Sequence, residues 1–294
     1  MLRVWLLVGV AIFSSALVVL GSSVSDQVRA AGDPVLVGAG DIASCSRQGD
    51  EATAKLLDNI SGTVYTLGDN AYPEGTDSQF RDCYGHSWGR HKARTRPSIS
   101  NHEYYGPEGA QPYYDYFGTS AGPRGKGYYS YDLGSWHIVV LNSMCSKVSC
   151  AAGSAQETWL KADLAAHPNK CTLAYFHYPR FSSGGNYTEV APFWKALYEA
   201  RAEVVLSGHV HAYERFAPQN PSGVADSAKG IREFIVGTGG KGVQRLNFLK
   251  PTSQVRNTTT LGVLKLILHL SGYEWKFVPI AGKTFTDSGT NMCH

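Results

Sequence analysis

Seven side chains in this sequence have the chemical types that bind metal ions, and each follows a short apolar run. The set comprises two aspartates, a tyrosine, an asparagine and three histidines: Asp41, Asp69, Tyr72, Asn101, His177, His209 and His211. Carboxylate, phenol, amide and imidazole donors, with no thiolate among them, suit hard or borderline ions such as iron, zinc and manganese. The chemistry to expect is therefore metal binding, with a water molecule that a bound cation can activate.

Taken singly, each of these residues has an ordinary structural explanation. An aspartate after a strand commonly makes a turn or caps a helix, and a lone histidine is usually structural or exposed. On a continuous strand His209 and His211 would point the same way, because side chains alternate. At a strand end the same pair can instead wrap around two neighbouring ions. The joint pattern, rather than any one residue, carries the inference.

The expected strands explain how residues so far apart could meet. Short apolar runs predict strands at 35–38, 63–67, 97–100, 138–141, 172–176, 204–206, 233–236, 262–270 and 273–280. In open α/β sheets, ligands bind beyond the carboxyl ends of strands, and the polar residues lie at these ends. Five separate strand ends would thus deliver them to one place.

Helical patterns separate the strands. Apolar residues recur at helical spacing over 53–60 and over 190–198. Ser154 and Glu157 form a capping-box pattern that predicts the start of another helix, which Pro168 ends. The alternation of strands and helices predicts an α/β layered domain.

Residues 1–30 have the features of a secretory signal peptide. Arg3 makes the start basic, residues 4–20 carry no charge, and small residues at 28 and 30 suit a cleavage site. An uncleaved anchor is the alternative, because the uncharged stretch approaches spanning length. We expect cleavage, a secreted or extracytoplasmic location without stable membrane insertion, and one domain over residues 34–294.

The six cysteines then favour disulfide bonds, because exported proteins mature in an oxidising compartment. One complete set of pairs is Cys145–Cys150, Cys45–Cys83 and Cys171–Cys293. Six cysteines can pair in many ways, and buried free thiols are an alternative for any of them. No spacing is Cys-x-x-Cys, which argues against a zinc knuckle.

Composition excludes several classes of protein. The chain has 294 residues, of which 43% are hydrophobic and 17% charged. These values argue against a disordered tail, a coiled coil and a polytopic membrane protein. The net charge of +3 is too mild to indicate a nucleic-acid partner.

The motifs in their order resemble a known family. The chain contains in sequence the blocks GDIA, GDNAY, SNHE, FHYPR and GHVHAYER. This order resembles the calcineurin-like metallophosphoesterases and, more narrowly, the purple acid phosphatases, from about Val35 to the C-terminus. Most metallophosphoesterases begin with Asp-x-His, whereas here Asp41 is followed by Ile42 and Ala43. Purple acid phosphatases also lack that histidine and carry a tyrosine where Tyr72 stands.

The resemblance implies a fold and a set of metal ligands. The fold would be a four-layer sandwich of two mixed sheets flanked by helices. The family pattern implies a first metal on Asp41, Tyr72 and His211, a second on Asn101, His177 and His209, and a bridging Asp69. Because phenolate is a hard anionic donor, the first ion would be Fe(III), and the second Fe, Zn or Mn.

The resemblance also implies hydrolysis of a small phosphorylated substrate. A metal-bound hydroxide would attack phosphorus in line, and Asn101, His102 and His177 would contact the substrate. His102 would donate a proton to the leaving group, or else only orient its neighbours. Phosphate monoesters are the leading substrates. A phosphodiesterase acting on nucleotides or lipid head groups is the alternative, and a non-catalytic surface binding protein with the same fold is a third possibility.

Three features depart from the family's usual pattern. Ser100 and Ala43 stand where glycines are usual. The large plant members carry an N-terminal β-sandwich, for which the expected cleavage site leaves no room here. We therefore expect the small single-domain form.

Two other catalytic motifs fail on their context. Residues 118–122 match the G-x-S-x-G nucleophile elbow, which requires a strand before it and a helix after it. The surrounding residues 104–131, rich in glycine, proline and tyrosine, are expected to be loop. Residues 237–242 match G-x-G-x-x-G but are followed by no helical pattern.

Overall fold

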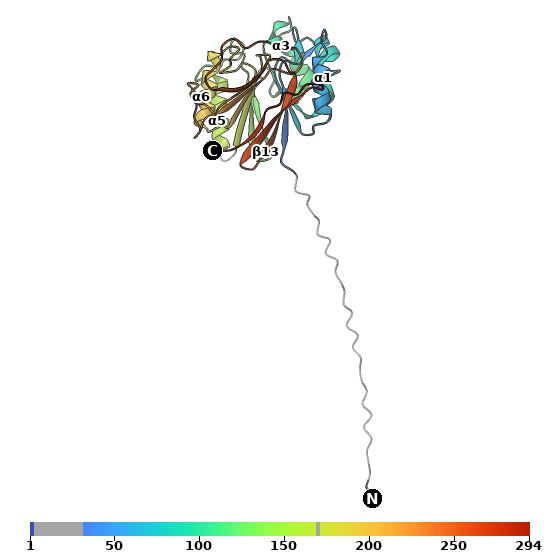
Figure 1. Cartoon of the computed structure of the whole chain (residues 1–294), viewed down its shortest axis with the longest axis vertical. Coiled ribbons are helices and arrows are strands. Elements are labelled where there is room, and N and C mark those ends of the chain that lie inside the picture. The colour runs from blue at the N-terminus through green and yellow to red at the C-terminus, as the bar shows by residue number, and fades with distance from the viewer. Residues whose placement is uncertain (3–31, 169–170) are drawn as a thin grey trace. The chain divides into compact units, whose positions relative to one another are not determined.

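The computed structural model describes residues 1–2, 32–168 and 171–294. The expected signal peptide, apart from its first two residues, lies outside the described residues. Residues 33–294 form one compact unit, in which two large mixed sheets face each other and helices cover their outer faces (Figure 1). This is the fold class that the sequence predicted.

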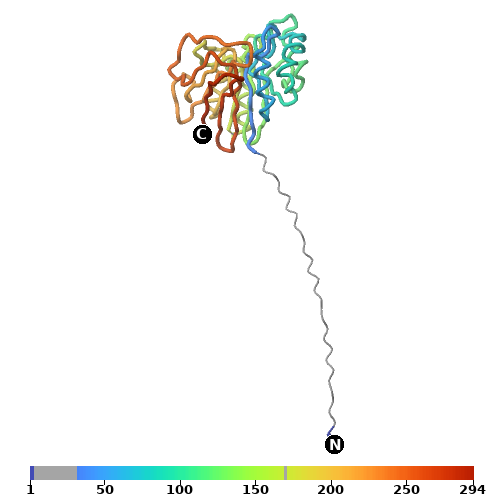
Figure 2. Tube along the Cα trace, turned by 45° about the vertical axis from the view of Figure 1, so that its right-hand side comes forward, coloured from blue at the N-terminus to red at the C-terminus, as the bar shows by residue number. Residues whose placement is uncertain are grey.

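The first sheet has six strands and brings the two ends of the domain together. Its spatial order is β15 (Ser288–Met292), β14 (Gly272–Pro279), β13 (Gly262–His269), β1 (Val35–Ala39), β3 (Thr63–Leu67) and β5 (Thr95–Ser98). Strands β1, β3 and β5 run parallel, whereas β13 is antiparallel to β1. Figure 2 shows the red C-terminal strands beside the blue start of the domain.

The second sheet has seven strands with a parallel centre. Its spatial order is β12 (Ser253–Asn257), β10 (Tyr213–Phe216), β11 (Arg232–Val236), β9 (Val204–Ser207), β8 (Cys171–Phe176), β7 (Trp136–Val140) and β6 (Tyr129–Leu133). Strands β7, β8, β9 and β11 run parallel. A short parallel pair joins β2 (Ala43–Ser44) to β4 (Ala71–Tyr72).

Helices fill the connections. The α-helices are α1 (Gly49–Asp58), α2 (Asp77–Gln79), α3 (His102–Tyr105), α4 (Gln111–Phe117), α5 (Ala155–Ala166) and α6 (Ala191–Glu199). A π-helical turn, η1 (Phe80–Tyr84), and three 3-10 turns, η2 (Trp88–Arg94), η3 (Gly118–Ala121) and η4 (Thr188–Val190), complete the set among the described residues.

Side chains along each strand of the second sheet point alternately to its two faces. The apolar residues of the two faces therefore pack in two separate cores. On β7, Ile138 and Val140 face the core between the sheets, whereas Val139 faces the core beneath α5 and α6. On α6, Phe193 and Trp194 are fully buried in that second core. Strands buried on both faces read as continuous apolar runs, which is why the sequence revealed them.

The expected strands are all present, with ends that differ by at most two residues. The capping of α5 is close to expectation. The Ser154 hydroxyl accepts a hydrogen bond of 3.2 Å from the Glu157 backbone N–H. The Glu157 carboxylate accepts one of 3.0 Å from the backbone N–H of Gly153, so the reciprocal bond forms one residue earlier than in a capping box.

The expectation of loop over residues 104–131 is wrong in part. The segment contains α4 and the beginning of β6. Helix α4 buries Tyr113 and Phe117, four residues apart, against Phe80. It ends at Gly118, whose φ of 57° favours glycine. Burial of these aromatic side chains therefore stabilises α4. The glycine and proline residues around it had suggested a loop instead.

The structure contains the three disulfide bonds suggested by the sequence: Cys45–Cys83, Cys145–Cys150 and Cys171–Cys293. Cys171 begins β8 and Cys293 follows β15, so this bond joins the two sheets. Among the described residues, no helix is long and apolar enough to cross a bilayer.

Candidate metal centre

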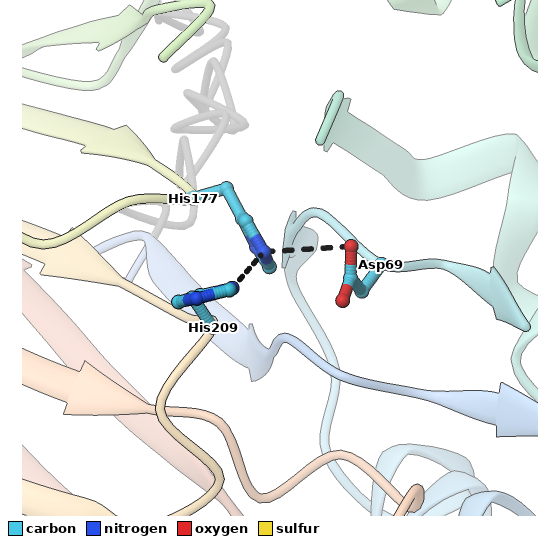
Figure 3. Close-up of side chains that lie close together, drawn as sticks. All are labelled: Asp69, His177 and His209. Atoms are coloured by element: carbon cyan, nitrogen blue, oxygen red, sulfur yellow. Dashed lines mark hydrogen bonds and ion pairs between the residues drawn. The ribbon is translucent and has the colours of Figure 1, made fainter. Parts of the chain in front are cut away.

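Five strand ends, three from the first sheet and two from the second, converge on one site. The residues predicted to bind metal follow β1, β3, β5, β8 and β9, and the structure brings six of the seven into direct contact with another of the set. The two sheets thus supply opposite walls of the same site, and Figure 3 shows Asp69 from one wall facing His177 and His209 from the other.

The first group of side chains surrounds the hydroxyl of Tyr72. That oxygen lies 3.0 Å from Oδ1 of Asp41, 2.6 Å from Oδ2 of Asp69 and 3.2 Å from Nε2 of His211. His211 Nε2 is also 3.2 Å from Asp41 Oδ1. One phenol proton can be donated to only one of two carboxylates. A multivalent cation among these atoms would satisfy both, so the donor set fits a metal ion.

The second group shares Asp69 with the first. Its other carboxylate oxygen, Oδ1, lies 3.4 Å from Nε2 of His177, which in turn lies 3.2 Å from Nδ1 of His209 (Figure 3). The far nitrogen of His177 lies 2.6 Å from the carbonyl of Leu67. A backbone carbonyl in this place fixes the proton on Nδ1 and leaves Nε2 as the free ligand atom. The two oxygens of Asp69 therefore face one group each.

Asn101 is the predicted ligand that touches none of the others, yet its geometry fits a ligand. Its amide nitrogen donates a hydrogen bond of 2.9 Å to the hydroxyl of Tyr105. Among the described residues, no donor reaches its buried Oδ1. A buried acceptor without a partner is costly, and a cation would satisfy it.

His102 lies at the rim of the site, not inside either group. Its Nε2 is 3.6 Å from Oδ2 of Asp69, and its Nδ1 is 2.5 Å from the carbonyl of Pro73. The ring also packs against Tyr72, with 4.3 Å between the ring centroids. The Pro73 carbonyl therefore orients the ring so that Nε2 faces the centre.

Three of the proposed metal ligands have a positive backbone φ angle. Asp41, Asp69 and His209 have φ values of 61°, 49° and 67°, in the left-handed region that non-glycine residues seldom adopt. Such conformations persist only where surrounding contacts hold them. One contact is a hydrogen bond of 2.9 Å from the His209 backbone N–H to Oδ2 of Asp41. Gly68 has a φ of 78°, and a Cβ there would lie 2.5 Å from the Ser100 Cβ.

Burial and neighbouring charges set the protonation of the ligands. Burial raises the pKa of Asp41, but the surrounding imidazoles, His211 above all, outweigh it and hold that pKa well below its usual range. Burial, together with Asp41 and Asp69, raises the pKa of Tyr72. Burial and the neighbouring His177 lower the pKa of His209 to about 4, which keeps its ring neutral and able to bind metal at neutral pH.

Several residues that support the centre were not predicted. The Ser100 hydroxyl contacts Oδ1 of Asp69 and lies 2.6 Å from Oε2 of Glu103. Burial and the nearby Asp69 raise the pKa of Glu103 to about 7. The hydroxyl of Tyr187 lies 2.5 Å from Nε2 of His209. Glu103 is the last residue of the SNHE block and could have been noticed, whereas no sequence signal marks Tyr187.

Comparison with known proteins places the chain among phosphoesterases. The calcineurin-like phosphoesterase family model matches residues 28–213. Purple acid phosphatase 22 of Arabidopsis thaliana is 30% identical over 230 residues, which cover 69% of this chain and 51% of that protein. The chain thus spans about half the length of this curated relative.

Two solved structures share the fold. Purple acid phosphatase PPD1 from yellow lupin superposes with a TM-score of 0.70 at 19% identity, over 88% of this chain and 54% of that one. GAP50, the anchor in the inner membrane complex of Plasmodium, superposes with a TM-score of 0.65 at 14% identity, over 90% and 89% of the two chains. At these identities the likeness establishes the fold alone.

Proposed function

The chain belongs to the calcineurin-like phosphoesterase family, and on this premise we propose that it is a purple acid phosphatase-like enzyme that hydrolyses phosphate monoesters. The observation that carries the proposal is the pair of ligand groups that share Asp69, because each carboxylate oxygen of that residue faces a separate group. A carboxylate shared by two ligand sets could hold two cations close together, and two nearby cations are what two-metal phosphoryl-transfer chemistry uses.

The proposed centre holds two cations. Asp41, Tyr72 and His211 would hold the first with one oxygen of Asp69, and Asn101, His177 and His209 the second with the other. Because phenolate is a hard anionic donor, we assign Fe(III) to the Tyr72 position and Fe, Zn or Mn to the other. When bound, such a pair supplies an activated water and draws charge from the phosphoryl oxygens.

The protein's own residues would position the substrate and give a proton to the departing ester oxygen. In hydrolysis a new oxygen–phosphorus bond to water forms while the bond to the ester oxygen breaks, and the departing oxygen must gain a proton. We assign this role to His102: Nδ1–H would donate to the Pro73 carbonyl, and the imidazolium form would give up the proton on Nε2, which faces the centre. Asn101 would contact the phosphoryl group beside it through its amide. The expected contact from His177 does not fit the site, because the Leu67 carbonyl engages its Nδ1 and its Nε2 is the proposed metal ligand. Little covalent work falls to the protein, so positioning and electrostatics dominate.

An extracytoplasmic location is part of the proposal. Three disulfide bonds within the domain are typical of proteins that mature in an oxidising compartment. The basic start and uncharged stretch of residues 1–30 would direct export, followed by cleavage after residue 30. Residues 34–294 would form the catalytic domain.

Substitution of the shared carboxylate tests the proposed function. Asp69→Asn keeps the shape of the side chain but removes its negative charge, and we expect it to abolish hydrolysis of phenyl phosphate. The matched control is Asp82→Asn, because Asp82 is a surface carboxylate paired only with its neighbour Arg81 among the described residues. Full activity in Asp69→Asn would overturn the proposal.

Two further measurements separate the alternatives. Rates on phenyl phosphate and on bis(phenyl) phosphate distinguish a monoesterase from a diesterase, and we expect the monoester to be faster. Metal analysis of the purified protein distinguishes an enzyme from a binding protein that kept only the fold. A protein without metal and without activity towards either ester would favour the binding protein.

A further inference from the structure

A cavity of about 240 Å³ lies beside the proposed metal centre. Its walls come from the loop after β7, which carries Met144 and the Cys145–Cys150 disulfide, and from the segment between β8 and α6, which carries Tyr178, Tyr187 and Val190. Strands β7, β8 and β9 are parallel neighbours, so the loops that follow them open at the same edge of the sheet as the metal ligands.

Two stacked tyrosine rings both line the cavity and contact the proposed metal ligand His209. Tyr178 and Tyr187 stack with 4.2 Å between centroids and 7° between ring planes. The edges of both rings meet His209, at centroid distances of 4.6 and 5.1 Å. Both tyrosines also line the cavity. The cavity therefore borders the surroundings of His209 at the second proposed metal position.

The lining is apolar with a single charge. Met144 and Val190 are buried, and the two tyrosines add aromatic surface. Glu189 is the only charged residue that the described part of the chain contributes to the lining, and it is exposed. No cationic side chain among the described residues lines the cavity, so a second phosphate or a carboxylate would enter without a cationic partner and would meet a like charge.

Resting on the proposed function, we propose that this cavity holds the alcohol portion of the substrate. The substrate class is then phosphate monoesters of uncharged apolar or aromatic alcohols, not polyphosphorylated compounds. The volume agrees, since a protein cavity of about 150 Å³ can hold benzene, and 240 Å³ admits one ring with a short linker. The Tyr178 and Tyr187 rings offer such a group an aromatic face.

The experiment compares esters whose leaving alcohols have similar acidity. The esters are 2-phenylethyl phosphate, propyl phosphate and 2-carboxyethyl phosphate, and kcat/KM is measured for each with the metal-loaded enzyme. We expect 2-phenylethyl phosphate to exceed propyl phosphate by about tenfold or more, because burying apolar groups in a pocket discriminates to this degree. The carboxylated ester should be the poorest of the three. Calorimetric binding of 2-phenylethyl phosphonate against propyl phosphonate gives the same comparison without turnover.

Two variants locate the effect in the cavity. Met144→Trp fills the space and should lower the ratio of 2-phenylethyl to propyl phosphate kcat/KM by about tenfold. Glu189→Lys should raise the ratio of 2-carboxyethyl to propyl phosphate kcat/KM. The matched control is Glu199→Lys, which makes the same charge change on the exposed face of α6, outside the cavity lining, and should leave both ratios unchanged.

Each outcome is decisive. Equal kcat/KM for 2-phenylethyl and propyl phosphate, or ratios that neither variant alters, would overturn the subsite while leaving the phosphoesterase intact. Equal phosphonate affinities would do the same. Hydrolysis of phenyl phosphate but of none of the three esters would overturn the subsite alone. Hydrolysis of neither phenyl phosphate nor the three esters by the metal-loaded enzyme would overturn the proposed function, and the subsite with it.

Discussion

The hydroxyl of Tyr187 lies 2.5 Å from Nε2 of His209, on the opposite side of the imidazole from the Nδ1 atom that faces His177. This contact holds the His209 ring in place from the side away from His177. If Nδ1 held a cation, the ring proton would be on Nε2, and Nε2–H would donate a hydrogen bond to the Tyr187 hydroxyl oxygen. Partners of this kind orient a metal-binding histidine and set its tautomer.

Tyr187→Phe should therefore weaken metal binding at the second position. Loss of such a partner typically costs about 10–100-fold in metal affinity, measured here as Zn²⁺ affinity of the apoprotein by chelator competition. Tyr178→Phe is the matched control, because that ring also packs against His209 but no hydrogen bond joins its hydroxyl to the imidazole. Equal affinities in the two variants would show that Tyr187 contributes only packing.

Ser100 connects the shared aspartate to a second buried carboxylate. Its hydroxyl contacts Asp69 Oδ1 and Glu103 Oε2, and it accepts a hydrogen bond of 2.5 Å from the Asp69 backbone N–H. Ser100→Ala leaves these fully buried groups short of a partner. We expect the free energy of unfolding to fall by about 1–3 kcal/mol, measured by urea denaturation of the apoprotein.

Ser98→Ala is the comparison for Ser100→Ala. That serine is equally buried, but within the described ranges its hydroxyl donates only to the backbone carbonyl of Thr66. Loss of one neutral hydrogen bond should cost about 1 kcal/mol. An effect of Ser100→Ala no larger than that of Ser98→Ala would contradict a special role for Ser100 at the shared carboxylate.

The sequence revealed the strands and the residues that follow them because both leave local signals. Parallel buried strands appear as apolar runs, and GDNAY or GHVHAYER places polar groups at their ends. The partners of the ligands leave no such signal. Tyr187 lies in a glycine- and serine-rich segment and reaches His209 only through the path of the loop after β8. The α4 helix was missed for a related reason, since its stability comes from packing against Phe80, far along the chain.

A buried histidine away from the metal centre makes stability depend on pH. His137, on β7, lies between Asp132 of β6 and Asp163 of α5, with ring nitrogens 3.0 and 2.8 Å from the carboxylates. His167 stacks on it, with 3.8 Å between centroids. Burial lowers the pKa of His137, but the hydrogen bonds to Asp163 and Asp132 outweigh it, so the pKa is raised.

A raised pKa in the folded state fixes the sign of this dependence. The contribution of protonated His137 is complete below the unfolded pKa of about 6.5 and is lost as the pH rises through the higher folded pKa. We expect the free energy of unfolding to fall from pH 6 to pH 9 more steeply in the wild type than in His137→Gln, measured by urea denaturation. His269→Gln should change the slope less, because its pairs with Asp33 and Glu274 are exposed and screened by solvent. Parallel slopes for wild type and His137→Gln would contradict this account.

The phenol of Tyr72 gives the proposed ferric site an optical signature. Its oxygen lies within 3.2 Å of atoms from Asp41, Asp69 and His211, so it would bind Fe(III) as a phenolate. Charge transfer from phenolate to Fe(III) should colour the purified protein violet to pink, and Tyr72→Phe should remove the visible absorption band. Tyr105→Phe is the control, because Tyr105 contacts Asn101 at the second position and should leave the band in place. An active, colourless enzyme containing only zinc would exclude ferric iron at Tyr72 while leaving the two-cation proposal standing.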